Sequence, residues 1–113
     1  MTASQDFQSL VGALLAATNA FDTDTAVALF AQDAVIDDPS TGERFIGQQG
    51  VRDYVERFFV GYHTVSVLLS VRHLEDGRAR ARIDFTGDFG HEIGRLDLTV
   101  ADGLITRIDA DLE

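Results

Sequence analysis

The sequence predicts one α+β domain spanning residues 1–113, in which three N-terminal helices pack on a curved antiparallel sheet. Two observations predict this class. Apolar residues recur at helical spacing over much of the chain up to Tyr62, and from His63 onward they alternate with polar residues, as in strands. Hydrophobic residues make up 45% of the 113 residues, which is enough apolar surface for the core of one domain.

The first helix is expected to run from an N-cap at Ser4 to about Asn19. Its apolar residues follow the i, i+3, i+4 spacing of one helical face: Phe7, Leu10, Val11, Leu14 and Leu15.

A second, shorter helix is expected after a cap at Asp22 or Thr23. Its apolar residues should face inward: Ala26, Val27 and Phe30. The third helix follows Gly47 and carries the strongest amphipathic pattern of the sequence, which continues to Tyr62.

Short extended segments are expected at residues 34–38, where Pro39 ends the first, and at residues 44–46. About four longer strands follow the third helix. They are separated by turn signals at Asp76-Gly77, between Gly87 and Gly90, and at Asp102-Gly103.

Alternation in these strands places polar residues, with charges of both signs, on one sheet face: Arg80, Arg82, Asp84, Arg95, Asp97 and Thr99. A face of this mixed kind suits a partly hydrated interface, so we expect a homodimer.

Composition excludes several classes of protein. The chain has no cysteine, which rules out disulfides and thiolate metal sites, and its formal net charge of −10 opposes binding to nucleic acid or to an anionic membrane surface. No basic leader and no membrane-spanning apolar run is seen, so a soluble, cytoplasmic protein is expected. Its three histidines, at positions 63, 73 and 91, are isolated, and no metal site is expected.

Several segments resemble a known superfamily. The stretch Asn-Ala-Phe-Asp-Thr-Asp at residues 19–24, Val-Ala-Leu-Phe-Ala-Gln-Asp-Ala at 27–34 and Val-Ile-Asp-Asp-Pro at 35–39 resemble NTF2-like proteins, which include SnoaL-like polyketide cyclases and ketosteroid isomerases. The resemblance implies a cone-shaped, cystatin-like or NTF2-like fold around an apolar pocket. Because this superfamily contains isomerases, cyclases, dehydratases, hydrolases and binding modules, the fold alone does not select a function.

The resemblance singles out Asp38, since ketosteroid isomerases place their general base at the matching Asp-Pro. The residue before a proline is held in extended geometry, and partial burial at a pocket mouth makes a carboxylate a better base. The alternative is that Asp38 only caps the following turn through its own side chain.

The same comparison finds no donors for a developing enolate oxygen. Where ketosteroid isomerases carry a tyrosine and a protonated acid, this chain has Leu14 and Leu96. Asp97 faces the other side unless a bulge near Gly94 rotates it inward. Tyr54 is the best substitute donor, and the alternative is a tyrosine packed in the core with its hydroxyl reaching solvent.

An apolar pocket is expected to be lined by residues from the helices and from the inward face of the sheet, with Phe30 and Val55 behind them: Leu14, Tyr54, Phe58, Ala81, Ile83, Phe85 and Leu96. Glu92 shares the inward alternation and is either a pocket acid or an exposed residue. The alternative is that these side chains meet and leave no cavity.

Two functions remain. One is an isomerase, lyase or cyclase that uses Asp38 on an apolar carbonyl compound without metal or organic cofactor. The other is a module without catalysis that binds an apolar ligand or supports a dimer.

Overall fold

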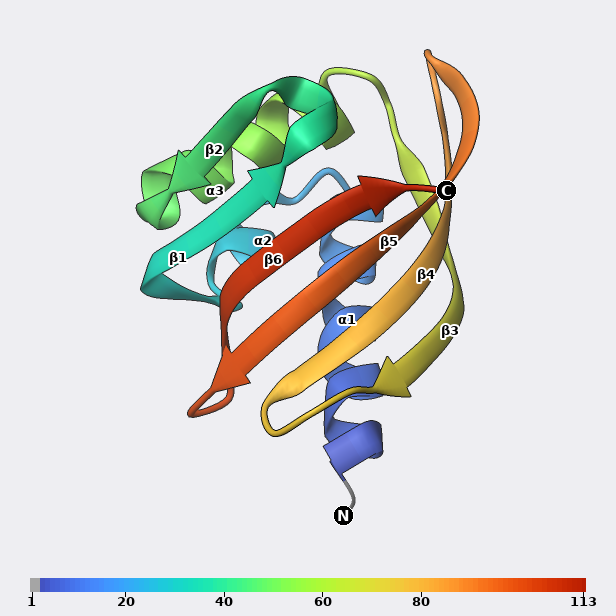
Figure 1. The fold of residues 1–113 in the computed structure, drawn as a ribbon. Helices are drawn as coiled ribbons and strands as arrows, with labels where there is room; N and C mark the ends of the chain where they lie inside the picture. Colours follow the sequence, from blue (N-terminus) through green and yellow to red (C-terminus); the bar gives the residue numbers. More distant parts are fainter. Residues whose placement is uncertain (1–2) are drawn as a thin grey trace.

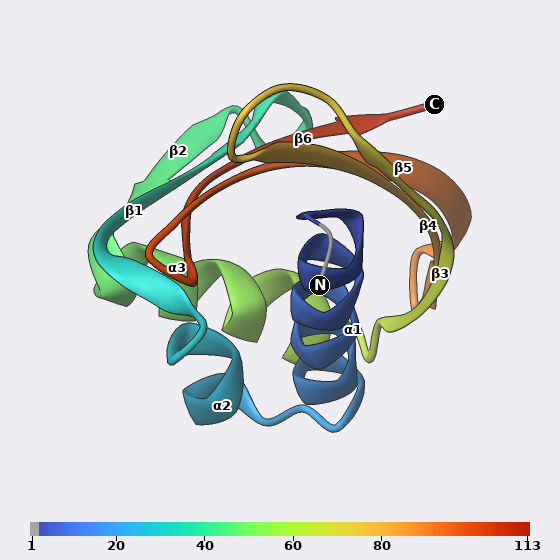
Figure 2. The same cartoon turned by 90° about the horizontal axis from the view of Figure 1, so that it is seen from below.

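Helical segments lie against the concave face of one curved, six-stranded sheet, as predicted (Figures 1 and 2). The computed structural model describes the backbone of residues 3–113 and the side chains from Phe7 onward. The order of helices and strands along the chain confirms the expected α+β class, since helices come first and a meander of four strands comes last.

The helices are α1 (Ala3–Asn19), α2 (Thr23–Val27) and α3 (Gly47–Val55), and α3 continues without a break into a π-helical turn, η2 (Glu56–Val60). Asp22 caps α2, as one of the two predicted alternatives, by accepting hydrogen bonds from the backbone N–H and the hydroxyl of Thr25. These bonds hold the pKa of Asp22 below its ordinary value. The end of α2 was predicted too late, because Phe30 begins a strand, although its side chain is buried as expected.

The sheet has the strand order β2-β1-β6-β5-β4-β3. Its strands are β1 (Phe30–Asp38), β2 (Glu43–Ile46), β3 (Val65–His73), β4 (Arg78–Gly87), β5 (Gly90–Ala101) and β6 (Leu104–Leu112). All neighbours are antiparallel except β1 and β6, which run parallel. This parallel pair departs from the expected antiparallel sheet, and it brings the end of β1 beside the last strand.

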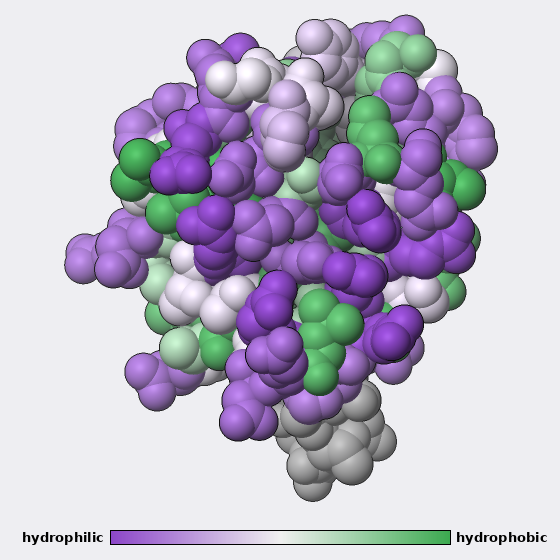
Figure 3. Space-filling model, in the orientation of Figure 1, coloured by the Kyte–Doolittle hydropathy of each residue, from purple (hydrophilic) through white to green (hydrophobic). Residues whose placement is uncertain are grey.

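The convex face carries the predicted charges. Arg80 binds Asp97 through two hydrogen bonds, of 2.8 and 3.0 Å, and Arg107 binds both Asp109 and Asp37. No helix of residues 3–113 covers this face (Figure 2), and Figure 3 shows apolar side chains scattered among hydrophilic ones there. Within the same residues, no helix is long and apolar enough to cross a membrane.

The side chain of Asn19 forms hydrogen bonds with the backbone of β3, the strand at one edge of the sheet. The amide group of Asn19, the last residue of α1, accepts from the backbone N–H of Ser66 at 2.7 Å and donates to its carbonyl oxygen at 2.9 Å. Asn19 therefore pairs with the outer edge of β3 in the way that another strand would.

Candidate functional site

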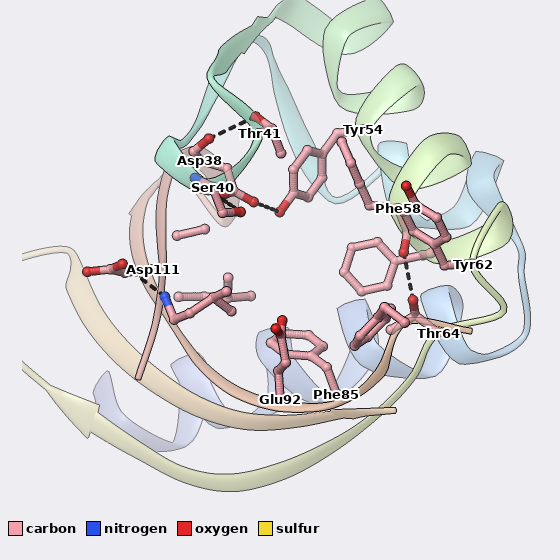
Figure 4. A pocket seen from close by; sticks show the side chains of 15 residues that line it. Asp38, Ser40, Thr41, Tyr54, Phe58, Tyr62, Thr64, Phe85, Glu92 and Asp111 are labelled. Carbon is pink, nitrogen blue, oxygen red and sulfur yellow. Dashed lines mark hydrogen bonds between the residues drawn. The ribbon is translucent and has the colours of Figure 1, made fainter. Parts of the chain in front are cut away.

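A cavity of about 430 Å³ opens between α3–η2 and the end of the sheet near the β4–β5 turn (Figure 4). Six aromatic residues line it: Tyr54, Phe58, Phe59, Tyr62, Phe85 and Phe89. Aliphatic contacts come from Leu96, Ala110 and Leu112. The polar lining consists of Asp38, Ser40, Thr41, Thr64, Glu92 and Asp111. The volume is within the range typical of small-molecule sites, so the side chains do leave a cavity.

Asp38 reaches the cavity because β1 ends there. Pro39 begins a single 3-10 turn, η1 (Pro39–Thr41), and Oδ1 of Asp38 accepts from the Ser40 backbone N–H at 3.1 Å and from its hydroxyl at 2.6 Å. The side chain is thus the cap of this turn, as the structural alternative predicted. It is also at the cavity wall, since Asp38 lines the cavity while only 8% of its surface is exposed.

Tyr54 supplies the third donor to Asp38. Its hydroxyl lies 2.7 Å from Oδ2, and its ring packs edge-on against Phe45 with ring centroids 5.1 Å apart. Burial, followed by the charge of Asp38 and the hydrogen bond to it, raises the pKa of Tyr54 well above its ordinary value. The phenol is therefore a neutral donor at neutral pH. Tyr54 is thus buried, as the packed-core alternative predicted, and it also lines the cavity, but its hydroxyl binds Asp38 and does not reach solvent.

The π-helical turn shapes the aromatic wall. The Gly61 N–H donates to the carbonyl of Glu56 at 2.8 Å, five residues back, and this wider turn lets two consecutive residues, Phe58 and Phe59, reach the cavity.

The far side of the cavity is formed by Phe85 and Glu92, which face each other across β4 and β5. A Cβ atom on Gly94 would lie 2.9 Å from the Phe85 ring and 3.0 Å from a backbone oxygen, so glycine makes room for that ring. The carboxylate of Glu92 points into the cavity on the side opposite Tyr54 (Figure 4), and the residue is exposed. Glu92 is thus an acidic residue of the cavity lining and is exposed as well.

Of the predicted site residues, Asp38, Tyr54, Phe58, Phe85 and Leu96 surround the cavity. The other five lie in the packed core and do not line it: Leu14, Phe30, Val55, Ala81 and Ile83. Asp97 lies on the convex face against Arg80, and the sheet is regular at Gly94, so no bulge turns Asp97 inward. The positions of Leu14 and Leu96 still offer no donor for an enolate oxygen.

Several lining residues had not been singled out, among them Tyr62, Thr64 and Phe89. Alternation along the last strand could have revealed Ala110 and Leu112, which share the inward face with Ile108. Two histidine rings contact carboxylates near the surface, His63 with Asp88 and His91 with Asp84. Among the side chains of residues 7–113, no group of three or more His, Asp or Glu is placed to hold a metal ion.

A family model described as a SnoaL-like domain matches residues 11–108. No curated protein matches the sequence. Among solved structures, the Bal32a protein from a soil-derived mobile gene cassette superposes with a TM-score of 0.87 at 18% identity, covering 98% of this chain and 92% of that one.

Two further structures carry assignments that are provisional. A Sinorhizobium meliloti protein assigned as a polyketide cyclase has a TM-score of 0.84 at 24% identity, covering 97% of this chain and 100% of that one. A Kribbella flavida protein assigned as a ketosteroid isomerase has a TM-score of 0.84 at 19% identity, covering 100% of this chain and 82% of that one.

At such identities these structures show the fold and not the activity. The family model, however, spans most of the chain. The protein therefore belongs to the SnoaL-like domain family and has its NTF2-like fold.

Proposed function

We propose that the protein binds an apolar carbonyl compound in the cavity and moves a proton on it, with Asp38 as the general base. The supporting observation is the state of the Asp38 carboxylate. It lies at the cavity wall, it is 8% exposed, and it forms no ion pair with the side chains of residues 7–113. Three neutral donors hold it in place.

The hydrogen bonds favour one of the two carboxylate oxygens as the acceptor of the proton. Each carboxylate oxygen has two lone pairs. Oδ1 uses both on Ser40, whereas Oδ2 accepts, among the described side chains, only from Tyr54. Oδ2 therefore keeps a free lone pair for a proton from the carbon beside the carbonyl, and it can return that proton to another carbon to complete an isomerisation.

Tyr54 can serve the same step. While Asp38 is ionised, the phenol donates to it. Once Asp38 holds the substrate proton, this hydrogen bond loses its charge assistance, and the phenol is free to donate to the enolate oxygen. Tyr54 would thus replace the donors that are missing at Leu14 and Leu96.

The alternative is a module that binds an apolar ligand without catalysis. It is favoured by the complete use of Oδ1 in capping η1, which gives Asp38 a structural reason to be present. In that case the cavity binds its ligand equally well with or without the carboxylate.

The test is the conversion of a 5-ene to a 4-ene 3-oxosteroid by the wild type, Asp38→Asn and Asp37→Asn. We expect Asp38→Asn to lose about 10²–10⁴-fold in kcat. Asp37→Asn is the matched control, since Asp37 lies on the convex face against Arg44 and Arg107, and it should keep turnover within about twofold.

Full turnover by Asp38→Asn would overturn the role of the base. If the wild type binds the steroid, measured by fluorescence or calorimetry, but does not convert it, the binding alternative gains support for this class of ligand.

We also propose that the protein is a homodimer through the convex face. The support is the apolar row on β3, where Val65, Val67 and Leu69 are 47%, 57% and 45% exposed next to the ion pairs of β4 to β6. Sedimentation should give a dimer at micromolar concentration, and Val67→Glu should shift it to monomer. Leu104→Glu, at the exposed β5–β6 turn, is the control, and a monomeric wild type would contradict the proposal.

A further inference from the structure

We propose that the mouth of the cavity is a cation subsite, which takes an organic ammonium group carried on an apolar ligand. The subsite consists of Tyr62, Phe85, Phe89 and Glu92. The inference rests on the proposed function only in treating the cavity as a ligand site, because it concerns binding and not proton transfer.

The charge of the lining is the first argument. None of the chain's nine basic residues lines the cavity, whereas three carboxylates do. Asp111 is paired with Arg95 at 3.1 Å, but Asp38 and Glu92 form no ion pair with the side chains described from Phe7 onward. An anionic ligand would meet two uncompensated negative charges, and a cation would compensate them.

The rings at the mouth give the second argument. Tyr62 and Phe89 stand nearly perpendicular, with centroids 6.2 Å apart and an interplanar angle of 83°. They are 45% and 44% exposed, so both rings are accessible to a ligand at the mouth. The two rings form an edge-to-face corner, and the ring faces left exposed there carry the negative side of the aromatic quadrupole, which attracts ammonium groups.

This corner is fixed by the backbone. The Asp88 N–H donates to the carbonyl of Tyr62 at 2.8 Å. A Cβ atom on Gly87 would lie 2.8 Å from that same carbonyl oxygen and 2.8 Å from the Phe89 ring, so only glycine allows the approach. The two rings are therefore held together before a ligand arrives, which reduces the entropy lost on binding.

Glu92 completes the subsite. Its carboxylate points into the cavity from β5, beside Phe85 and opposite Tyr54 (Figure 4). Phe58 is left out, because the Arg57 guanidinium already lies 5.1 Å from its ring centroid and binds Glu43 outside the cavity. A ligand that places its ammonium group at this mouth would extend its apolar body toward Asp38.

The experiment compares two probes of the same shape, 3-hydroxyphenyltrimethylammonium and the neutral 3-tert-butylphenol, by calorimetric titration of the full chain. We expect the cation to bind about tenfold or more tightly than the neutral probe. Glu92→Gln should reduce this preference severalfold, and Phe89→Leu should weaken the cation more than the neutral probe. Glu75→Gln, in the β3–β4 turn away from the cavity, is the matched control and should leave the preference unchanged.

Equal affinity for the two probes, or a preference that survives Glu92→Gln unchanged, would overturn the cation subsite. Both substituted side chains are exposed, so loss of folding does not obscure the result. The outcome is separate from that of the steroid assay: Asp38→Asn can abolish turnover while the probes bind equally, and the cation can be preferred by a protein that turns nothing over.

Discussion

The hydroxyl of Tyr54 donates a hydrogen bond of 2.7 Å to Oδ2 of Asp38, and both side chains are almost entirely buried. Replacing Tyr54 by Phe leaves a buried carboxylate oxygen without its donor. We expect a loss of about 1–3 kcal/mol in the free energy of unfolding, measured by urea denaturation. On any substrate that the wild type turns over, kcat should fall more than KM rises, since the phenol acts on the developing charge.

Tyr62→Phe is the control for this substitution. Tyr62 also lines the cavity, but its hydroxyl has no hydrogen bond within the described part of the chain and the side chain is 45% exposed. Its stability should change by less than about 0.5 kcal/mol. Equal losses in the two variants would mean that the bond to Asp38 contributes nothing.

The same pair predicts a loss of stability in alkali. Burial and the neighbouring carboxylate raise the pKa of Tyr54 in the folded protein, whereas the unfolded chain releases that proton at about pH 10. Above this pH the folded state binds more protons than the unfolded state, so the stability of the fold decreases as the pH rises. Below about pH 10 the contribution of the protonated Tyr54 to stability is fully present. Between about pH 9.5 and 11.5, unfolding curves of the wild type should fall more steeply than those of Tyr54→Phe. If the stability of the wild type and that of Tyr54→Phe fall in parallel as the pH rises, Tyr54 is not the group that causes the loss.

The fold could be predicted from periodicity because alternation records which face of a strand is buried. Arg80 and Asp97 were placed on the convex face in this way, and they bind each other there. The parallel pairing of β1 with β6 could not be predicted, since it joins segments about seventy residues apart. Phe30 is buried in β1, and it would also be buried in a helix. A short apolar segment therefore does not distinguish a helix from a strand.

The site was harder to predict than the fold. Alternation gives the face of a strand but not the position along it, so Ala81 and Ile83 were expected at the cavity together with Phe85. In the structure the first two lie in the core and only Phe85, near the end of β4, reaches the cavity. The π-helical turn directs Phe59 to the cavity, and α-helical periodicity does not reveal such a turn in the sequence.

The pairing of Asn19 with Ser66 predicts a role at the sheet edge. Asn19→Ala removes both hydrogen bonds to the β3 backbone, and we expect a loss of about 1–2 kcal/mol in stability together with faster aggregation on heating. Asn19→Asp is the informative comparison, since it can still accept from the Ser66 N–H but cannot donate to its carbonyl. The stability of Asn19→Asp should lie between that of the wild type and that of Asn19→Ala. An Asn19→Ala variant as stable as the wild type would exclude a role of Asn19 at the sheet edge.

Substitution by alanine should change the stability of the protein in opposite directions at two glycines, Gly87 and Gly12. A Cβ atom on Gly87 would lie 2.8 Å from the carbonyl oxygen of Tyr62, a backbone atom that cannot rotate away, so Gly87→Ala should cost about 1–3 kcal/mol and spread the Tyr62–Phe89 corner. Gly12 is exposed on α1 and its Cβ would meet nothing within 4 Å, so Gly12→Ala should stabilise the protein by about 0.5–1 kcal/mol.

Denaturation midpoints of the two variants measure these signs directly, and titration with the ammonium probe shows whether the corner has opened. We expect Gly87→Ala to bind the cation more weakly while Gly12→Ala binds it as the wild type does. A Gly87→Ala variant with wild-type stability and cation affinity would show that the backbone accommodates the methyl group, and that the corner at the mouth does not depend on glycine.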